Sequence, residues 1–188
     1  MWALIGLLLT IGGTFLEAHI TNFPWNWNQQ GIQTLSLGVT YQIGAVLLVG
    51  CMGGKNAAAL SQVAYLILGL TPWFPIFSQG GGLDYLKEPT FGYLLGFIPG
   101  AWVCGLLAFK APPRLESLAF SCICGLLAIH LVGLSYLFLT HSLSAAGVEA
   151  LPLWQASLKY SFQPLLSQLA VVCAVTVIAF NLRHLMFY

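Results

Sequence analysis

Residues 117–148 read SLAFSCICGLLAIHLVGLSYLFLTHSLSAAGV and contain no Lys, Arg, Asp or Glu. A membrane-spanning helix needs about 20 consecutive, mostly apolar residues, and this stretch is longer than that. Because every backbone polar group inside lipid must be hydrogen-bonded internally, a helix is the expected structure for such a stretch. The stretch therefore predicts a helix that crosses a lipid bilayer.

The composition of the whole chain indicates the same environment. Of the 188 residues, 59% are hydrophobic and only 6% are charged, whereas a soluble domain has roughly 25% charged residues. The high hydrophobicity also excludes an intrinsically disordered chain. A formal net charge of +1 provides no basic surface for nucleic acid. We therefore expect a multi-pass protein of the cell membrane that contacts the lipid bilayer and no nucleic acid.

The few charged residues divide the chain into uncharged stretches at 1–16, 18–54, 56–83, 89–109, 117–148 and 160–182. Each stretch is long enough to supply one apolar helix. We expect a single domain over residues 1–188, of the all-α class, with six transmembrane helices. These helices are expected near residues 2–19, 34–52, 56–71, 91–110, 116–139 and 160–182.

The positive charges predict how this bundle sits in the membrane. Six spans place both termini, and the connections after the second and fourth helices, on one side. That side contains Lys55, Lys110, Arg114 and Arg183, against Lys87 and Lys159 on the other. Because cytoplasmic connections are enriched in Lys and Arg, both termini are expected in the cytoplasm.

The outer connections, near residues 21–33, 72–90 and 140–158, are the long ones, and long connections often bind ligands. In the first, Trp25 and Trp27 alternate with asparagines. Two interpretations stay open for these tryptophans. They form an aromatic belt at the level of the lipid headgroups, or they form one wall of a ligand pocket.

The second outer connection contains Gln79 and three successive glycines, Gly80–Gly82. Glycines let the backbone turn with positive φ or approach a ligand closely. Lys87 precedes the next expected helix, whose first turn contains Thr90 and Tyr93. A helix N-terminus attracts a carboxylate, so this connection is either a ligand site or a simple flexible turn.

Two polar side chains lie inside expected helices. Gln42 needs hydrogen-bond partners there, because an unpaired buried amide costs a few kcal/mol. It therefore joins two helices or binds a ligand. His130, near the middle of the fifth helix, marks a functional site or bonds a neighbouring helix.

Neither a metal site nor a catalytic site is expected. The cysteines lie in or beside expected helices, and the Cys122-x-Cys124 spacing is neither a redox motif nor a zinc motif. Nucleophile, base and orienting residue do not occur together, and paired carboxylates and nucleotide-binding motifs are missing. We therefore expect no enzyme activity and no cofactor.

Three stretches, in order, resemble BioY, the biotin-specific substrate-binding (S) component of energy-coupling factor (ECF) transporters. The first is Val39-Thr40-Tyr41-Gln42 with Ala45-Val46-Leu47-Leu48-Val49-Gly50. The second is Gly53-Gly54-Lys55 with Ala59-Leu60-Ser61 and Tyr65-Leu66-Ile67-Leu68-Gly69. The third is Phe77-Ser78-Gln79-Gly80-Gly81-Gly82 with Pro89-Thr90-Phe91-Gly92-Tyr93-Leu94 and Gly96-Phe97.

This resemblance implies an S-component-like bundle of six helices with a biotin pocket near the outer surface. It also implies docking to a transmembrane T component that is driven by two ABC ATPases. The pocket residues that it implies are Gln42, Gly80, Gly81, Gly82, Thr90, Gly92 and Tyr93. We add Trp25 and Trp27 as ring contacts, Gln79 as a polar contact and Lys87 near the ligand carboxylate.

The chain departs from the family pattern on its last helix. The family often has P-G-D-x-x-K there, whereas this chain has Pro164-Leu165-Leu166-Ser167-Gln168-Leu169. Lys87, Lys159 and Gln168 are the candidates to replace the missing charges. For docking, the family often has A-x-x-x-A on its first helix, and here small residues occur at Ala3, Gly6, Thr10 and Gly13.

Three alternatives stay open. The chain binds another small vitamin or a biotin precursor, since the Asp and Lys are missing. Alternatively, it is an integral membrane enzyme or redox protein that uses His130 and the cysteines. Finally, it is a structural subunit that binds no ligand.

Overall fold

The computed structural model describes residues 1–22, 25, 27, 31–78, 80–143 and 152–187. Most of them are helical. In chain order, the elements are α1 (Trp2–Phe15), β1 (Glu17–Thr21), β2 (Thr34–Thr40), α3 (Gln42–Leu70), η2 (Leu83–Lys87), α4 (Phe91–Ala108), α5 (Leu115–Leu143), α6 (Leu153–Ser157), the π-helical turn η3 (Leu158–Phe162) and α7 (Gln163–Phe187).

Four helical segments are long and apolar enough to cross a membrane. They are Gln42–Leu70, Phe91–Ala108, Leu115–Leu143 and the continuous segment Leu153–Met186, which runs through α6, η3 and α7. The helix α1 is also apolar but shorter. The protein is therefore a mostly helical membrane protein, as the charge-free stretches predict.

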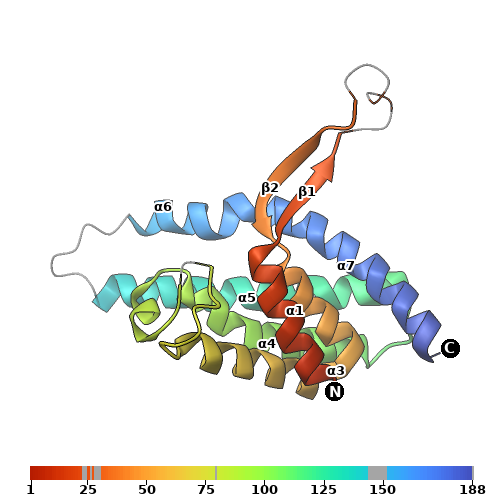
Figure 1. Cartoon of the computed structure of the whole chain (residues 1–188), viewed down its shortest axis with the longest axis horizontal. Helices are drawn as coiled ribbons and strands as arrows, with labels where there is room; N and C mark the ends of the chain where they lie inside the picture. Colours follow the sequence, from red (N-terminus) through yellow and green to blue (C-terminus); the bar gives the residue numbers. More distant parts are fainter. Residues whose placement is uncertain (23–24, 26, 28–30, 79, 144–151, 188) are drawn as a thin grey trace.

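The helices pack in a bundle in which α3 contacts α1 and α4, and α4 contacts α5 (Figure 1). The helix α7 lies across the bundle against α3 and α5. One apolar cluster, which includes Leu47 and Leu126, lies among α3, α4, α5 and α7. The other includes Tyr65 and Phe77 and joins α3 and α4 to the 71–90 connection.

The second and third expected helices meet in α3 at a sharp change of direction, seen in Figure 1 between its orange and gold parts. Gly54 interrupts the helix with φ 75° and ψ 172°, a conformation that is essentially restricted to glycine. A Cβ atom on Gly105 of α4 would lie 2.5 Å from the backbone nitrogen of Lys55. Two glycines therefore allow α3 to turn and α4 to approach the turn closely.

The sequence prediction was wrong at the start of the second helix and at the end of the first. The strands β1 and β2 form an antiparallel hairpin, with Glu17 opposite Thr40 and Thr21 opposite Thr34. The hairpin projects from the bundle in Figure 1. The segment Thr34–Thr40 alternates polar or small residues with Leu and Val, which is the period of a strand. The expected all-α class is therefore corrected to mostly helical.

Candidate functional site

A cavity of about 200 Å³ lies between four parts of the chain. They are the junction of β2 and α3, the 71–90 connection, the first turns of α4, and the helix that runs through η3 and α7. The lining residues are Val39, Thr40, Gln42, Ile43, Ser78, Tyr85, Thr90, Tyr93, Leu94, Phe97, Tyr160 and Gln168. Apolar and hydrogen-bonding side chains are mixed in this wall, as in small-molecule sites.

Gln42, the first residue of α3, is held at the wall by a buried hydrogen bond. Its Nε2 donates to the hydroxyl of Tyr65 at 2.8 Å, and that hydroxyl lies 3.2 Å from Thr14 Oγ1. Tyr65 is fully buried and also donates to the carbonyl of Ile76 at 3.3 Å. The position of Gln42 is thus set together by α1, by α3 and by the 71–90 connection, which contains Ile76.

Elsewhere in the wall, a chain of hydrogen bonds joins α4, η3, α5 and α7. The hydroxyls of Tyr93 and Ser161 lie 2.6 Å apart, and Ser161 Oγ lies 3.2 Å from His130 Nδ1. His130 Nε2 lies 2.7 Å from Gln168 Oε1. Because an amide oxygen only accepts, Nε2–H donates to Gln168 and Nδ1 accepts from Ser161. His130 therefore helps to fix Tyr93 and Gln168, which both line the cavity.

The π-helical turn η3 (Leu158–Phe162) determines which side chains reach this region. Tyr160 lines the cavity, and the adjacent Ser161 joins the hydrogen-bond chain. Such π-helical turns occur frequently at functional sites. Among the described residues, the cavity wall contains no Lys, Arg, Asp or Glu. Lys159 is exposed, and its Nζ lies 5.3 Å from the ring centroid of Tyr160, which lines the cavity.

Several expected pocket residues have other surroundings. Gly80 and Gly82 adopt positive φ. The N–H of Gly82 donates to the carbonyl of Gly69 at 2.9 Å. A Cβ on Gly81 would lie 2.8 Å from the same carbonyl oxygen. A Cβ on Gly92 would lie 2.3 Å from Tyr136 of α5. Gly81 and Gly92 therefore allow close packing, and Gly80 and Gly82 allow the positive φ of the turn. None of the four is among the described residues that line the cavity. Gln79 lies outside the described residues.

The charged and aromatic candidates also lie away from the wall. Lys87 forms an exposed ion pair with Asp84 at 3.1 Å. Trp25 and Trp27 are 73% and 40% exposed in the connection between the hairpin strands, and Trp27 Nε1 donates to the carbonyl of Asn22. Of the pocket candidates, Gln42, Thr90 and Tyr93 come together around the cavity, whereas Trp25, Trp27 and Lys87 do not.

The small residues on α1 that were expected to dock a partner face the interior of this chain. Thr10 and Gly13 are buried, as is Gly6, where a Cβ would lie 2.7 Å from Val49. A Cβ on Gly13 would lie 3.0 Å from the backbone nitrogen of Gln42. Ala3 is half-buried. This stripe therefore packs α1 against α3.

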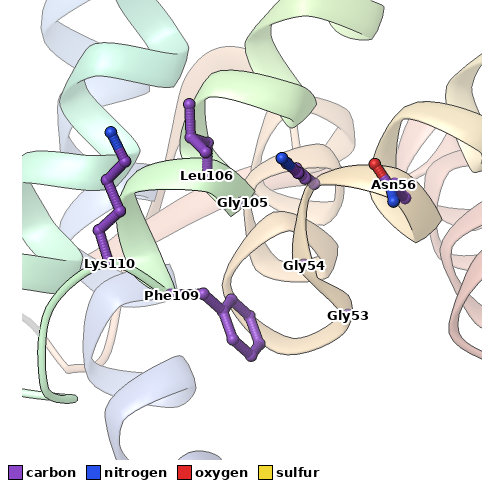
Figure 2. A pocket seen from close by; sticks show the side chains of 8 residues that line it. Gly53, Gly54, Asn56, Gly105, Leu106, Phe109 and Lys110 are labelled. Atoms are coloured by element: carbon purple, nitrogen blue, oxygen red, sulfur yellow. The ribbon is translucent and has the colours of Figure 1, made fainter.

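A second hollow, of about 370 Å³, lies at the turn of α3 (Figure 2). It is lined by residues 53–56 of α3 and by Gly105, Leu106, Phe109 and Lys110 at the end of α4. Lys55 Nζ lies 5.6 Å from the ring centroid of Trp102. Its lining includes two cations, Lys55 and Lys110, and among the described residues it has no chain of side-chain hydrogen bonds like that of the first cavity.

Comparison with known proteins agrees with this architecture. A 21.2 kDa protein of Cyanophora paradoxa, encoded in the psbX–ycf33 intergenic region, is 28% identical over 187 residues, which cover 99% of this chain and 95% of that protein. The biotin transporter BioY of Thermotoga maritima is 38% identical over 109 residues, which cover 57% of this chain and 63% of that protein.

A solved structure has the same fold. The crystal structure of the S-component for biotin from an ECF-type ABC transporter superposes with a TM-score of 0.66. The superposition covers 97% of this chain and 88% of the solved chain, and the two are 17% identical in sequence. Residues 6–187 match the BioY family. This chain therefore belongs to the BioY family of multi-pass membrane transporters, which are not enzymes.

Proposed function

We propose that this protein binds biotin from outside the cell as the membrane-embedded S component of an ECF-type ABC transporter. The observation that supports this function best is the cavity between α3, α4 and the η3–α7 segment. Its lining combines apolar side chains, which include Leu94 and Phe97, with hydrogen-bonding side chains such as Gln42 and Tyr93. Biotin needs both, because it has an apolar chain and a polar ureido ring.

The proposal includes six membrane spans with both termini in the cytoplasm. The spans are α1, the two parts of α3 on either side of Gly54, α4, α5 and Leu153–Met186. Both chain ends lie at the same end of the bundle as the turn of α3 (Figure 1). The positive charges that favour a cytoplasmic position are those of Lys55, Lys110, Arg114 and Arg183.

Within the cavity, Gln42, Tyr93 and Gln168 would hold the uncharged polar ring of biotin. Uncharged donors and acceptors suit a ureido group, and the described wall has no charged residue. The carboxylate would then point toward the rim, where Lys159 lies over Tyr160. Lys159 thus replaces the acid and lysine that the family often has on its last helix.

The S component would act with a T component and two ABC ATPases, as the family resemblance implies. Because Gly6, Thr10 and Gly13 are buried against α3, docking would use the opposite side of α1. Leu4 and Leu8 are more than 60% exposed there. Conversion of both residues to Ser should weaken co-purification with the T component while biotin binding stays unchanged.

Equilibrium binding of labelled biotin to the purified protein in detergent tests the proposed ligand. We expect saturable binding in the nanomolar range, with desthiobiotin as a weaker competitor and thiamine as no competitor. Stronger competition by desthiobiotin would favour the alternative of a biotin precursor as the ligand. Absence of binding by folded protein would exclude biotin, and the family assignment would remain.

A further inference from the structure

Three cysteines that are far apart in the sequence meet in the core. The Sγ atom of Cys51 on α3 lies 3.7 Å from that of Cys104 on α4 and 3.5 Å from that of Cys122 on α5. All three sulfur atoms lie within 4.8 Å of one another, and the three free thiols are fully buried. We propose that they form a binding site for a soft, thiophilic metal ion, and that Cu(I) fits the site best.

The spacing of the sulfur atoms suits three metal–thiolate bonds. A metal about 2.3 Å from each of three sulfurs in one plane holds the sulfurs about 4.0 Å apart. The two shortest separations here, 3.5 and 3.7 Å, need only a small expansion to reach this value. Since three helices each supply one sulfur, the bundle already holds the ligands in place.

The set of ligands favours Cu(I) over other ions. Thiolates select soft ions such as Cu(I) and Zn(II), and a structural zinc site almost always has four ligands. Among the described residues, no His, Asp or Glu belongs to this group. The carbonyl oxygen of Leu47 lies 3.5 Å from Cys104 Sγ, and the side chain of Thr176 contacts Cys122. Cu(I) is stable with three sulfur ligands, so the missing fourth ligand favours it.

A buried positive charge, the guanidinium of Arg183, contacts the end of α4 that follows Cys104. Coordination of Cu⁺ by three thiolates releases three protons and leaves the site negatively charged. Arg183 is only 6% exposed, and its Nη1 donates to the carbonyl of Ala108, one helical turn beyond Cys104. Its Nε has no hydrogen-bond partner among the described residues. This guanidinium would offset part of the negative charge of the loaded site.

The cleft in Figure 2 offers a way in for the ion. Its wall contains Gly53, Gly54 and Gly105. In the sequence, Gly53 follows Cys51 by two residues and Gly105 directly follows Cys104. Only Gly54 leaves open space there, since a Cβ on it would meet Phe109 at an ordinary 3.6 Å, whereas Trp2 and the backbone of Lys55 pack closely against Gly53 and Gly105. An ion would therefore approach from the end of the bundle that contains the chain termini.

Titration of the purified full chain with Cu(I), under a non-thiol reductant and against a colorimetric Cu(I) chelator, tests this site. We expect one tightly bound Cu(I) per chain and a thiolate-to-copper absorption band in the near ultraviolet. Loss of a group that hydrogen-bonds a metal ligand lowers metal affinity about 10–100-fold. Loss of a ligand itself, in Cys104→Ser or Cys122→Ser, should therefore lower the Cu(I) affinity at least about 100-fold. Cys124→Ser and Cys173→Ser, at a half-buried and an exposed cysteine, are the matched controls.

X-ray absorption of the copper-loaded wild-type protein tests the site without any variant. Three sulfur neighbours at about 2.3 Å would support it, and nitrogen or oxygen neighbours would overturn it. Failure of the folded wild-type protein to bind Cu(I) would also overturn it. So would binding that is equally weakened by Cys124→Ser or Cys173→Ser. Biotin binding, measured in parallel, reports separately on the proposed function.

Discussion

At the scale of single residues, the bonds from His130 to Gln168 and Ser161 are the least expected feature of the site. A polar ring inside a membrane bundle is costly unless it is hydrogen-bonded. Both ring nitrogens of His130 have partners, at 2.7 and 3.2 Å. Since Tyr93 and Gln168 line the cavity, we infer that His130 positions ligand-binding groups without touching the ligand.

We predict that His130→Leu weakens biotin binding about 5–150-fold, because loss of a buried hydrogen-bond partner costs about 1–3 kcal/mol. His130→Gln should retain most of the affinity, since its amide can still donate to Gln168. The measurement is equilibrium binding in detergent. Ser135→Ala is the control on the same helix, because Ser135 is exposed and its hydroxyl donates to the carbonyl of Leu131 on its own helix. Equal affinities for the Leu and Gln variants would contradict the positioning role.

A second prediction concerns Lys159 at the rim. Lys159→Gln should weaken biotin binding about 2–5-fold, because exposed charge pairs contribute about 0.5–1 kcal/mol. Binding of biotin amide, which lacks the carboxylate, should not change. Lys87→Gln is the matched control, since Lys87 pairs with Asp84 away from the cavity. A similar loss for biotin and its amide would show that Lys159 does not contact the carboxylate.

At the scale of elements, the turn inside α3 depends on one backbone conformation. Gly54→Ala should destabilise the protein by about 1–3 kcal/mol, because its φ and ψ are essentially restricted to glycine. A Cβ there would meet Phe109 only at an ordinary 3.6 Å, so the cost lies in the backbone. Thermal unfolding in detergent measures the change.

Gly12→Ala on α1 is the control for that measurement. A Cβ on Gly12 would meet no atom of the described residues within 4 Å, and Ala favours a helix by about 1 kcal/mol over Gly. Its unfolding midpoint should be unchanged or higher. A fall in the midpoint as large as that of Gly54→Ala would mean that the turn is not specially dependent on glycine.

The hairpin shows what charge-free stretches do and do not predict about an element. The expected helices at 91–110 and 116–139 agree with Phe91–Ala108 and Leu115–Leu143. The expected helix at 34–52 fails over Thr34–Thr40, since a lack of charge reports the environment rather than the backbone. The alternation in this segment was the available signal for a strand.

At the scale of the whole molecule, the orientation in the membrane can be measured directly. Ile32→Cys in the hairpin connection and Arg114→Cys between α4 and α5 are both at exposed residues. We predict that a membrane-impermeant maleimide labels Ile32→Cys in intact cells and Arg114→Cys only after permeabilisation. The wild-type chain provides the background labelling. The reverse pattern would place the termini outside.

The candidate site was only partly predictable, because it depends on contacts between distant helices. Gln42, Thr90 and Tyr93 come from stretches with recognisable patterns, and all three line the cavity. Ser161 joins His130 from 31 residues away, and Gln168 from 38. Nothing in the local pattern specifies these pairings or the π-helical turn. Cys51, Cys104 and Cys122 converge in the same way, although their spacing in the sequence matches no metal motif.

The π-helical turn Leu158–Phe162 has a consequence for how this protein tolerates insertions and deletions. A π-helical turn accommodates one residue more than an α-helix needs, while the helix on either side continues in register. Deletion of one residue between 158 and 162 should therefore leave the core side of α7, with Val171, Val175 and Ala179, in place. It would rotate Tyr160 and Ser161 away from their present positions. A chain shortened by this one residue should reach the membrane folded and yet be unable to retain its ligand. Ligand binding could then be lost or changed in evolution while the fold is kept.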